Sequence, residues 1–205
     1  MINKLKSNIN SLDYHQALTF GYLICKKLFP DYATFSEYED FGKPDILYGG
    51  LVALRKQISG FDNINKINSL IDSLWNDEEL TPDTDDFPGN ISASLALNSV
   101  SAMYHCLKFA STKNKEFIIK VSDLSLESVI MFYVVSNNID QNQPKEKYEE
   151  ILNNAVFIQS EIHLQESLIE KIKTLEDSNK RIYTKLKTND NKLVENSLFS
   201  QFIYT

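Results

Sequence analysis

The stretch from Ile91 to Leu107 constrains the fold of this chain most, because it contains no formally charged residue. Serine, alanine, leucine, valine and methionine make up most of it, and its length and spacing are typical of an α-helix. A helix that is apolar on nearly every side is stable only when other elements cover nearly every side. Its small residues let neighbouring backbones approach, and its serine hydroxyls can bond to carbonyls of the preceding turn. The sequence therefore predicts a buried central helix over 91–107.

Apolar residues recur at helical spacing along most of the remaining chain, which has only 6 glycines and 5 prolines. Ser11 or Asp13 is the expected cap of a first helix that Pro30 ends, and Asn63 that of a later one. The further helical segments predicted are a short turn over 32–39 and helices over 45–58, 64–74, 115–137 and 148–175. We expect an all-α bundle of six to eight helices forming one domain over 1–187. A polar linker and an aromatic tail occupy 188–205.

Charge and cysteine content narrow the classes of function. The chain carries 28 acidic against 21 basic residues, a formal net charge of −7. That is the wrong sign for a protein that binds nucleic acid by neutralising phosphates. Cys25 and Cys106 lie in apolar runs and are expected to be buried, reduced thiols. No apolar stretch reaches the roughly 20 residues of a membrane span, and the first ten residues do not resemble a secretion signal, so we expect a cytoplasmic protein that binds neither membrane nor nucleic acid.

Catalytic and metal-binding patterns are missing from the sequence. The three histidines, His15, His105 and His163, fall on different predicted helices without metal-ligand spacing. Cys106 follows His105 directly, and neighbours on a helix point about 100° apart, so they do not form a thiol–imidazole pair. No nucleophile or phosphate-binding motif occurs. We therefore predict no cofactor, no metal and no catalytic residue, which favours a protein that is not an enzyme.

The densest charge lies in the segment 75–89, which is expected to be the longest loop. Its carboxylates do not follow the calcium-loop pattern, because Phe87 occupies the third ligand position. The favoured interpretation is a segment that leads into the central helix, whose dipole attracts negative charge. A docking surface for a basic partner is the second interpretation. The candidate partner-binding residues are Asp83, Asp85, Asp86 and Phe87, together with Tyr38 and Phe41 from an aromatic cluster that we otherwise expect to pack on the core.

Several stretches of the sequence resemble one known family. They are LTFGYLICKKLFPDYATFSEYEDF over 18–41 with Gly42 and Pro44 after it, PDTDDF over 82–87 before the small-residue helix, the two serine-containing pairs at 121–122 and 124–125, and QSEI over 159–162 with Gln165 and Glu166. Together they are similar to the YjaG-like bacterial proteins, the DUF416 family of unknown function, over most of 13–175. The resemblance implies a compact all-α domain and carries over no catalytic or binding residue.

Two hypotheses of function remain open. In the first, the chain is a non-catalytic interaction or adaptor domain that docks a protein partner through the acidic loop; one version is an immunity-type protein that neutralises a basic toxin. In the second, it is a small-molecule-binding or enzymatic bundle with a pocket beside the central helix, lined by Ser101, Tyr104 and His105. A homodimer is compatible with either.

Overall fold

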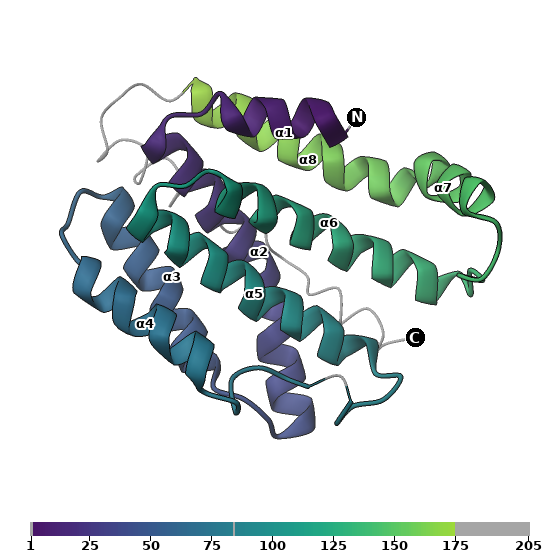
Figure 1. Cartoon of the computed structure of the whole chain (residues 1–205), viewed down its shortest axis with the longest axis horizontal. Coiled ribbons are helices and arrows are strands. Elements are labelled where there is room, and N and C mark those ends of the chain that lie inside the picture. Colours follow the sequence, from purple (N-terminus) through teal and green to yellow (C-terminus); the bar gives the residue numbers. More distant parts are fainter. Residues whose placement is uncertain (1, 84, 175–205) are drawn as a thin grey trace.

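The computed structural model describes residues 2–83 and 85–174, and within these ranges the chain forms helices joined by loops, with no strand (Figure 1). This confirms the predicted all-α bundle. The eight helices are α1 (Ile2–Asn10), α2 (Tyr14–Glu39), α3 (Pro44–Ile58), α4 (Ile64–Asn76), α5 (Ile91–Thr112), α6 (Glu116–Ser136), α7 (Lys145–Asn154) and α8 (Val156–Lys173).

Helix α5 is the axis of the bundle, as predicted. It packs against α2, α6, α4 and α3, and Figure 1 shows it in the middle of the molecule. Its alanines are buried, and the Ser99 hydroxyl oxygen lies 2.9 Å from the carbonyl oxygen of Leu95 and 2.8 Å from that of Leu28 on α2. A serine that bonds to two helices at once is possible only where their backbones come close. The small residues of α5 therefore allow other helices to pack closely against several of its sides.

A glycine sets the distance between α2 and α5. A Cβ atom placed on Gly21 would lie 2.8 Å from the Cys106 sulfur and 2.7 Å from the Cδ1 atom of Ile118. Both distances are shorter than carbon contacts in a packed core allow. Gly50 on α3 has the same role, because its Cβ would lie 2.6 Å from the Met103 sulfur. The two helices therefore lie against α5 without an intervening side chain at these points.

Helix α2 is longer than the sequence predicts. It begins after a capping box in which the Asp13 carboxylate accepts the Gln16 backbone N–H, and it continues through Pro30 to Glu39. The prediction that Pro30 ends the helix, and that 32–39 is a separate turn, is therefore wrong. A proline in a helix costs about 3 kcal/mol. The residues on both sides of it, Leu28 and Tyr32, are fully buried, and this burial offsets the cost.

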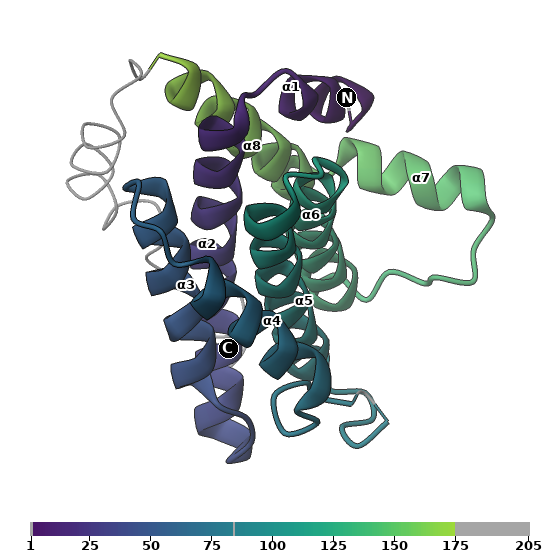
Figure 2. The ribbon, with the colours of Figure 1, turned by 60° about the vertical axis from the view of Figure 1, so that its left-hand side comes forward.

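Two further helix boundaries differ from the sequence prediction. The segment 148–175 is not one helix, because Ala155 adopts an extended conformation that separates α7 from α8. Ala155 is buried, whereas α7 buries none of its residues and lies apart from the main bundle in Figure 2. The N-terminal helix α1 was not predicted, although its Leu5 and Ile9 are buried. Among so many Asn and Lys residues, two core positions give only a weak periodic signal.

A buried polar network joins α8 to α2 and α6. The Lys27 ammonium of α2 pairs with the Glu161 carboxylate of α8 and donates to the Ser125 hydroxyl of α6 at 2.9 Å. Gln165 donates to Glu161 at 2.8 Å and accepts the Ser122 hydroxyl at 2.6 Å. Glu161 and Gln165 are both buried, and a buried charge is tolerated only with such complete pairing. The network therefore fixes where α8 lies on the bundle.

No helix among the described residues is both long and apolar enough to cross a membrane. The predicted linker and tail over 188–205 lie outside the described residues, and the predicted boundary at 187 stays a prediction.

We expect Gly21→Ala to lower the free energy of unfolding by roughly 1–2 kcal/mol, because overpacking against Cys106 and Ile118 outweighs the gain in helix propensity. Gly49→Ala is the matched control, since its Cβ would meet only Leu70, at 3.9 Å. That variant should be more stable by about 0.5–1 kcal/mol. Urea unfolding measures both values, and equal effects of the two substitutions would contradict the close packing of α2 on α5.

Candidate functional site

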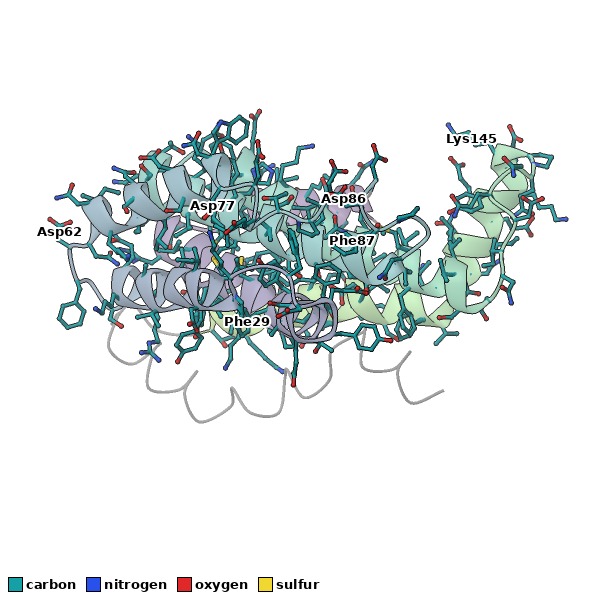
Figure 3. All side chains as sticks on the ribbon, turned by 90° about the horizontal axis from the view of Figure 1, so that it is seen from below. Phe29, Asp62, Asp77, Asp86, Phe87 and Lys145 are labelled. Carbon is teal, nitrogen blue, oxygen red and sulfur yellow. The ribbon has the colours of Figure 1, made fainter. Side chains whose placement is uncertain are left out.

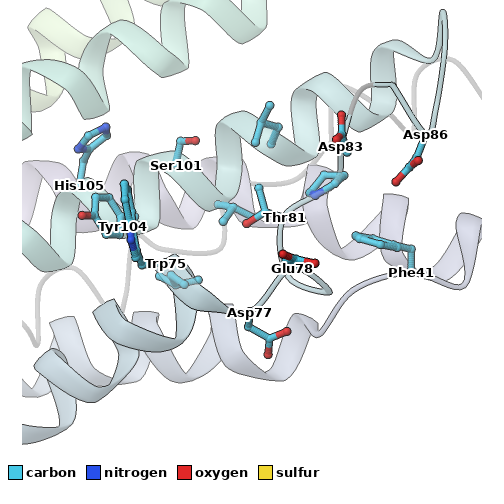
Figure 4. Close-up of a pocket in the computed structure, with 14 residues that line it drawn as sticks. Phe41, Trp75, Asp77, Glu78, Thr81, Asp83, Asp86, Ser101, Tyr104 and His105 are labelled. Carbon is cyan, nitrogen blue, oxygen red and sulfur yellow. The ribbon is translucent and has the colours of Figure 1, made fainter.

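A cleft of about 720 Å³ lies beside α5, between the C-terminal end of α4 and the loop 77–90. In Figure 4, Trp75 and His105 lie at one end of the cleft, Phe41 and Asp86 at the other, and Glu78 between them. The residues that line it are Phe41, Leu74, Trp75, Asp77, Glu78, Thr81, Pro82, Asp83, Asp86, Leu97, Val100, Ser101, Tyr104 and His105.

The floor of the cleft is the one stripe of α5 that the other helices leave partly open. Leu97, Ser101, Tyr104 and His105 are half-buried, whereas most of the residues between them are buried. Their spacing of three and four residues places all four on one side of the helix. The prediction of a helix that is covered on nearly every side is therefore confirmed except along this stripe, which lines the cleft.

The loop 77–90 is held at two points. The buried Tyr32 hydroxyl donates to the Leu80 carbonyl at 2.9 Å and accepts the Lys43 backbone N–H at 3.0 Å. Gly42 makes this approach possible, because its Cβ would lie 2.5 Å from the Tyr32 oxygen and its φ of 93° suits glycine. Further along, Phe87 packs edge-on against Phe35, with 5.2 Å between ring centroids. The carboxylates of Asp83 and Asp86 therefore lie between two anchored points of the loop.

One end of α2 also contacts the loop. The Asn90 side-chain amide donates to the Glu39 carboxylate at 2.7 Å, and the Asn90 oxygen accepts the Ser92 backbone N–H at the start of α5. Asn90 is thus the cap of α5. At α4 the predicted cap residue, Asn63, is in place, but it donates to the Ala53 carbonyl and caps nothing.

Carboxylates give the cleft its charge. Lys43 pairs with Asp77 at 2.7 Å and with Glu79 at 2.8 Å, and the hydrogen bond to Asp77, followed by that to Glu79, raises the pKa of the Lys43 ammonium. Glu78, Asp83 and Asp86 have no ion-pair partner among the residues that the structure describes. The cleft therefore carries an excess of negative charge near its opening.

A stacked pair of aromatic rings, from the exposed Trp75 and the half-buried Tyr104, lies at one end of the cleft. The Trp75 indole stacks on the Tyr104 ring, with centroids 5.5 Å apart and an interplanar angle of 30°. Trp75 is nevertheless 73% exposed, which is unusual for the largest side chain. The Lys108 ammonium lies 5.8 Å from the centroid of the Tyr104 ring. Tyr104 is thus in contact with both an aromatic ring and a cation, and most of the indole faces solvent.

His105 lies at the same end but packs into apolar surroundings. Its ring stacks on Phe117 with centroids 5.8 Å apart, and its Nδ1 atom is buried without a hydrogen-bond partner. Burial, and then the nearby positive charge of Lys120, lower the pKa of the imidazole below its ordinary value of 6.5. His105 is therefore uncharged at neutral pH, with no carboxylate hydrogen-bonded to its Nδ1 atom to orient it.

The two competing sets of predicted residues line the same cleft. Asp83, Asp86 and Phe41 from the docking hypothesis line it together with Ser101, Tyr104 and His105 from the pocket hypothesis (Figure 4). The other three docking candidates do not line it. Asp85 is exposed, Phe87 packs on Phe35 and Phe41, and Tyr38 is 68% exposed on α2.

The sequence analysis did not predict the stacked pair of Trp75 and Tyr104, which we call the aromatic platform. Trp75 was assigned to the loop, but it belongs to the last turn of α4, and this places it against Tyr104. Glu78, three residues further along, also lines the cleft. A tryptophan next to a run of carboxylates was the available signal, although the partner ring lies 29 positions away in the sequence.

The described residues hold no cluster of three or more histidine, cysteine or carboxylate side chains suited to a metal ion. Both cysteines are buried, as predicted. Burial and the neighbouring Cys106 raise the pKa of the Cys25 thiol well above its ordinary value. Such a thiol is a poor nucleophile, since the thiolate is the reactive form.

These features define the chain as an all-α domain with one acidic and aromatic cleft. It belongs to the DUF416 family of proteins of unknown function, whose sequence model matches residues 4–194. The match confirms the predicted resemblance and extends it to α1. The fold is also similar to the crystal structure of a DUF416 family protein from Shewanella baltica OS155, with a TM-score of 0.71 and 24% identity over 90% of this chain and 93% of that one. No curated protein matches the sequence. The comparisons assign no activity.

Because the pKa of His105 is lowered by folding, the unfolded chain binds more protons just below pH 6.5. This contribution to stability is present above that pH and is lost as the pH falls through the lowered pKa. We expect the unfolding free energy to fall more steeply between pH 7 and pH 5 in the unsubstituted protein than in His105→Phe. His163→Gln, a change at an exposed histidine, is the control. Identical slopes for the protein and His105→Phe, measured by urea unfolding at each pH, would contradict the burial of this imidazole.

Proposed function

We propose that this protein is a cytoplasmic, non-catalytic interaction domain that docks a basic protein partner in the cleft beside α5. The observation that carries this proposal is the combination, in one cleft, of unpaired carboxylates and an exposed tryptophan. Carboxylates attract a basic partner over distance, and a large exposed aromatic residue supplies contact area once the partner is bound.

The loop geometry is compatible with docking as well as with the favoured sequence interpretation, in which the loop leads into the central helix. Asn90 provides the capping hydrogen bond of α5, and Asp83, Asp85 and Asp86 are exposed. The loop is also anchored at Leu80 and Phe87, on either side of these carboxylates. A loop that is held on both sides loses less conformational entropy on binding than a free one. An immunity-type protein that neutralises a basic toxin is one form that such a domain takes.

A small-molecule site in the same cleft is the second candidate function. Its volume falls within the range of ligand pockets, and the uncharged His105 can act as a proton acceptor near neutral pH. Against this stands the stacking of His105 on Phe117 and the lack of a hydrogen-bonded group that would orient it. Docking therefore explains more of the lining residues.

Affinity capture from the host lysate tests the docking proposal. We expect a basic protein to be recovered in stoichiometric amount, to dissociate as ionic strength rises, and to be lost when Asp83, Asp85 and Asp86 are all changed to Asn. The three positions are on the loop surface, so the substitutions leave the core unchanged.

The matched control changes Glu146, Glu149 and Glu150 of α7 to Gln, which removes the same charge far from the cleft. Figure 3 shows Lys145, at the start of α7, at the far end of the molecule from Asp77 and Asp86. Retention of the partner by the control confirms that position matters, not net charge. Recovery of the protein alone, or equal loss in both variants, would overturn docking through this loop.

A further inference from the structure

We infer that the docked segment is extended and presents an arginine to Trp75, with further basic side chains along the carboxylates of the cleft. This inference rests on the proposed function and names the chemistry of the partner. It commits to an arginine-containing peptide segment as the occupant, argued from the shape of the aromatic platform and from charge complementarity.

The aromatic platform, which consists of the stacked rings of Trp75 and Tyr104, explains why we infer a planar cation as the bound group. Tyr104 stacks on the Trp75 indole, while 73% of the Trp75 residue surface remains exposed. A guanidinium group is flat and stacks on an indole face, and tryptophan is the best aromatic partner for a cation. The Lys108 ammonium over Tyr104 shows that a cation already lies at this aromatic pair, at its tyrosine. The exposed indole is the part of the pair left for a ligand.

The carboxylates account for the extended shape of the occupant. In Figure 4, Glu78 lies between the two ends of the cleft, Asp83 further from Trp75, and Asp86 near Phe41 at the end opposite Trp75. The unpaired negative charges therefore extend from the middle of the cleft to its Phe41 end, and Trp75 lies beyond them at the other end. A single small cation neutralises only one end. An extended chain places successive side chains along the whole length, with basic groups spaced to meet each carboxylate.

Arginine fits this arrangement better than lysine. Its fork of donors pairs bidentately with a carboxylate while its plane stacks on an aromatic ring, and it is less strongly hydrated. Lysine offers a compact charge that gains from the carboxylates but little from the flat indole face. The identity of the basic residue should therefore matter at the Trp75 end.

Tryptophan fluorescence gives a direct test, because Trp75 is the single tryptophan of the chain. The probe is an octapeptide of alternating arginine and glycine, compared with the same peptide containing lysine. We expect the arginine peptide to change the Trp75 emission in a saturable manner and to bind roughly three- to tenfold more tightly than the lysine peptide. Binding of both should weaken as salt is added.

Variants show which groups carry the binding. We expect Trp75→Ala, measured by calorimetry, to bind the arginine peptide roughly three- to tenfold more weakly and to lose the preference for arginine. Asp83→Asn with Asp86→Asn should weaken both peptides, and the α7 control with Gln at 146, 149 and 150 should bind as the unsubstituted protein does. Because Trp75 is on the surface, Trp75→Ala should remain folded, which circular dichroism checks.

Two results would overturn the inference. Equal affinity for the arginine and lysine peptides would show that the platform does not select a guanidinium group. No saturable change in Trp75 emission with the arginine peptide would show that the segment does not reach the indole. If a basic partner is still captured and is lost in the Asp83, Asp85 and Asp86 variant, the proposed function stands without this inference. If capture also fails, both fall.

Discussion

The close contact of α2 and α3 with α5 is the constraint on which the rest of the structure depends. Glycines at positions 21 and 50 leave room for the Cys106 and Met103 side chains, so both helices lie directly against α5. Protein cores are packed tightly, and a contact of this kind allows little variation in helix position. Helices α4 and α6 then cover α5 further, except along the stripe through Ser101 and His105. The cleft thus exists because the covering of the central helix is incomplete on one side.

Buried polar interactions fix the parts that apolar packing alone does not. The ion pair between Lys27 and Glu161 holds α8 on the bundle, and the Tyr32 hydroxyl joins the Leu80 carbonyl of the acidic loop to the Lys43 N–H at the start of α3. Removing one member of such a buried pair lowers the stability of the fold, because the polar group that remains has neither water nor a partner to bond to. Gln165, Glu161, Ser122 and Ser125 are also among the residues on which the family resemblance was based. In this chain those residues have a structural role.

The sequence predicted most of the helices and the buried central helix, but not how distant segments meet. Charge-free composition over 91–107 was sufficient to identify α5, and helical spacing placed Ser101, Tyr104 and His105 on one side of it. Helix propensity gave the wrong prediction at two positions. The helix continues through Pro30, where neighbouring residues are buried, and it breaks at Ala155, which is itself buried. The cleft itself depends on contacts across tens of residues, such as that between Trp75 and Tyr104, which no local pattern contains.

The central claim is that a basic segment binds in the cleft beside the half-buried stripe of α5. The most direct measurement is a two-dimensional NMR titration of the ¹⁵N-labelled protein with the arginine–glycine octapeptide. If the claim is correct, the Trp75 indole N–H and the backbone amides of Glu78, Ser101 and Tyr104 shift together and saturate at one site. Shifts that gather around α7 and α8, or that spread evenly over all acidic surfaces, would contradict it.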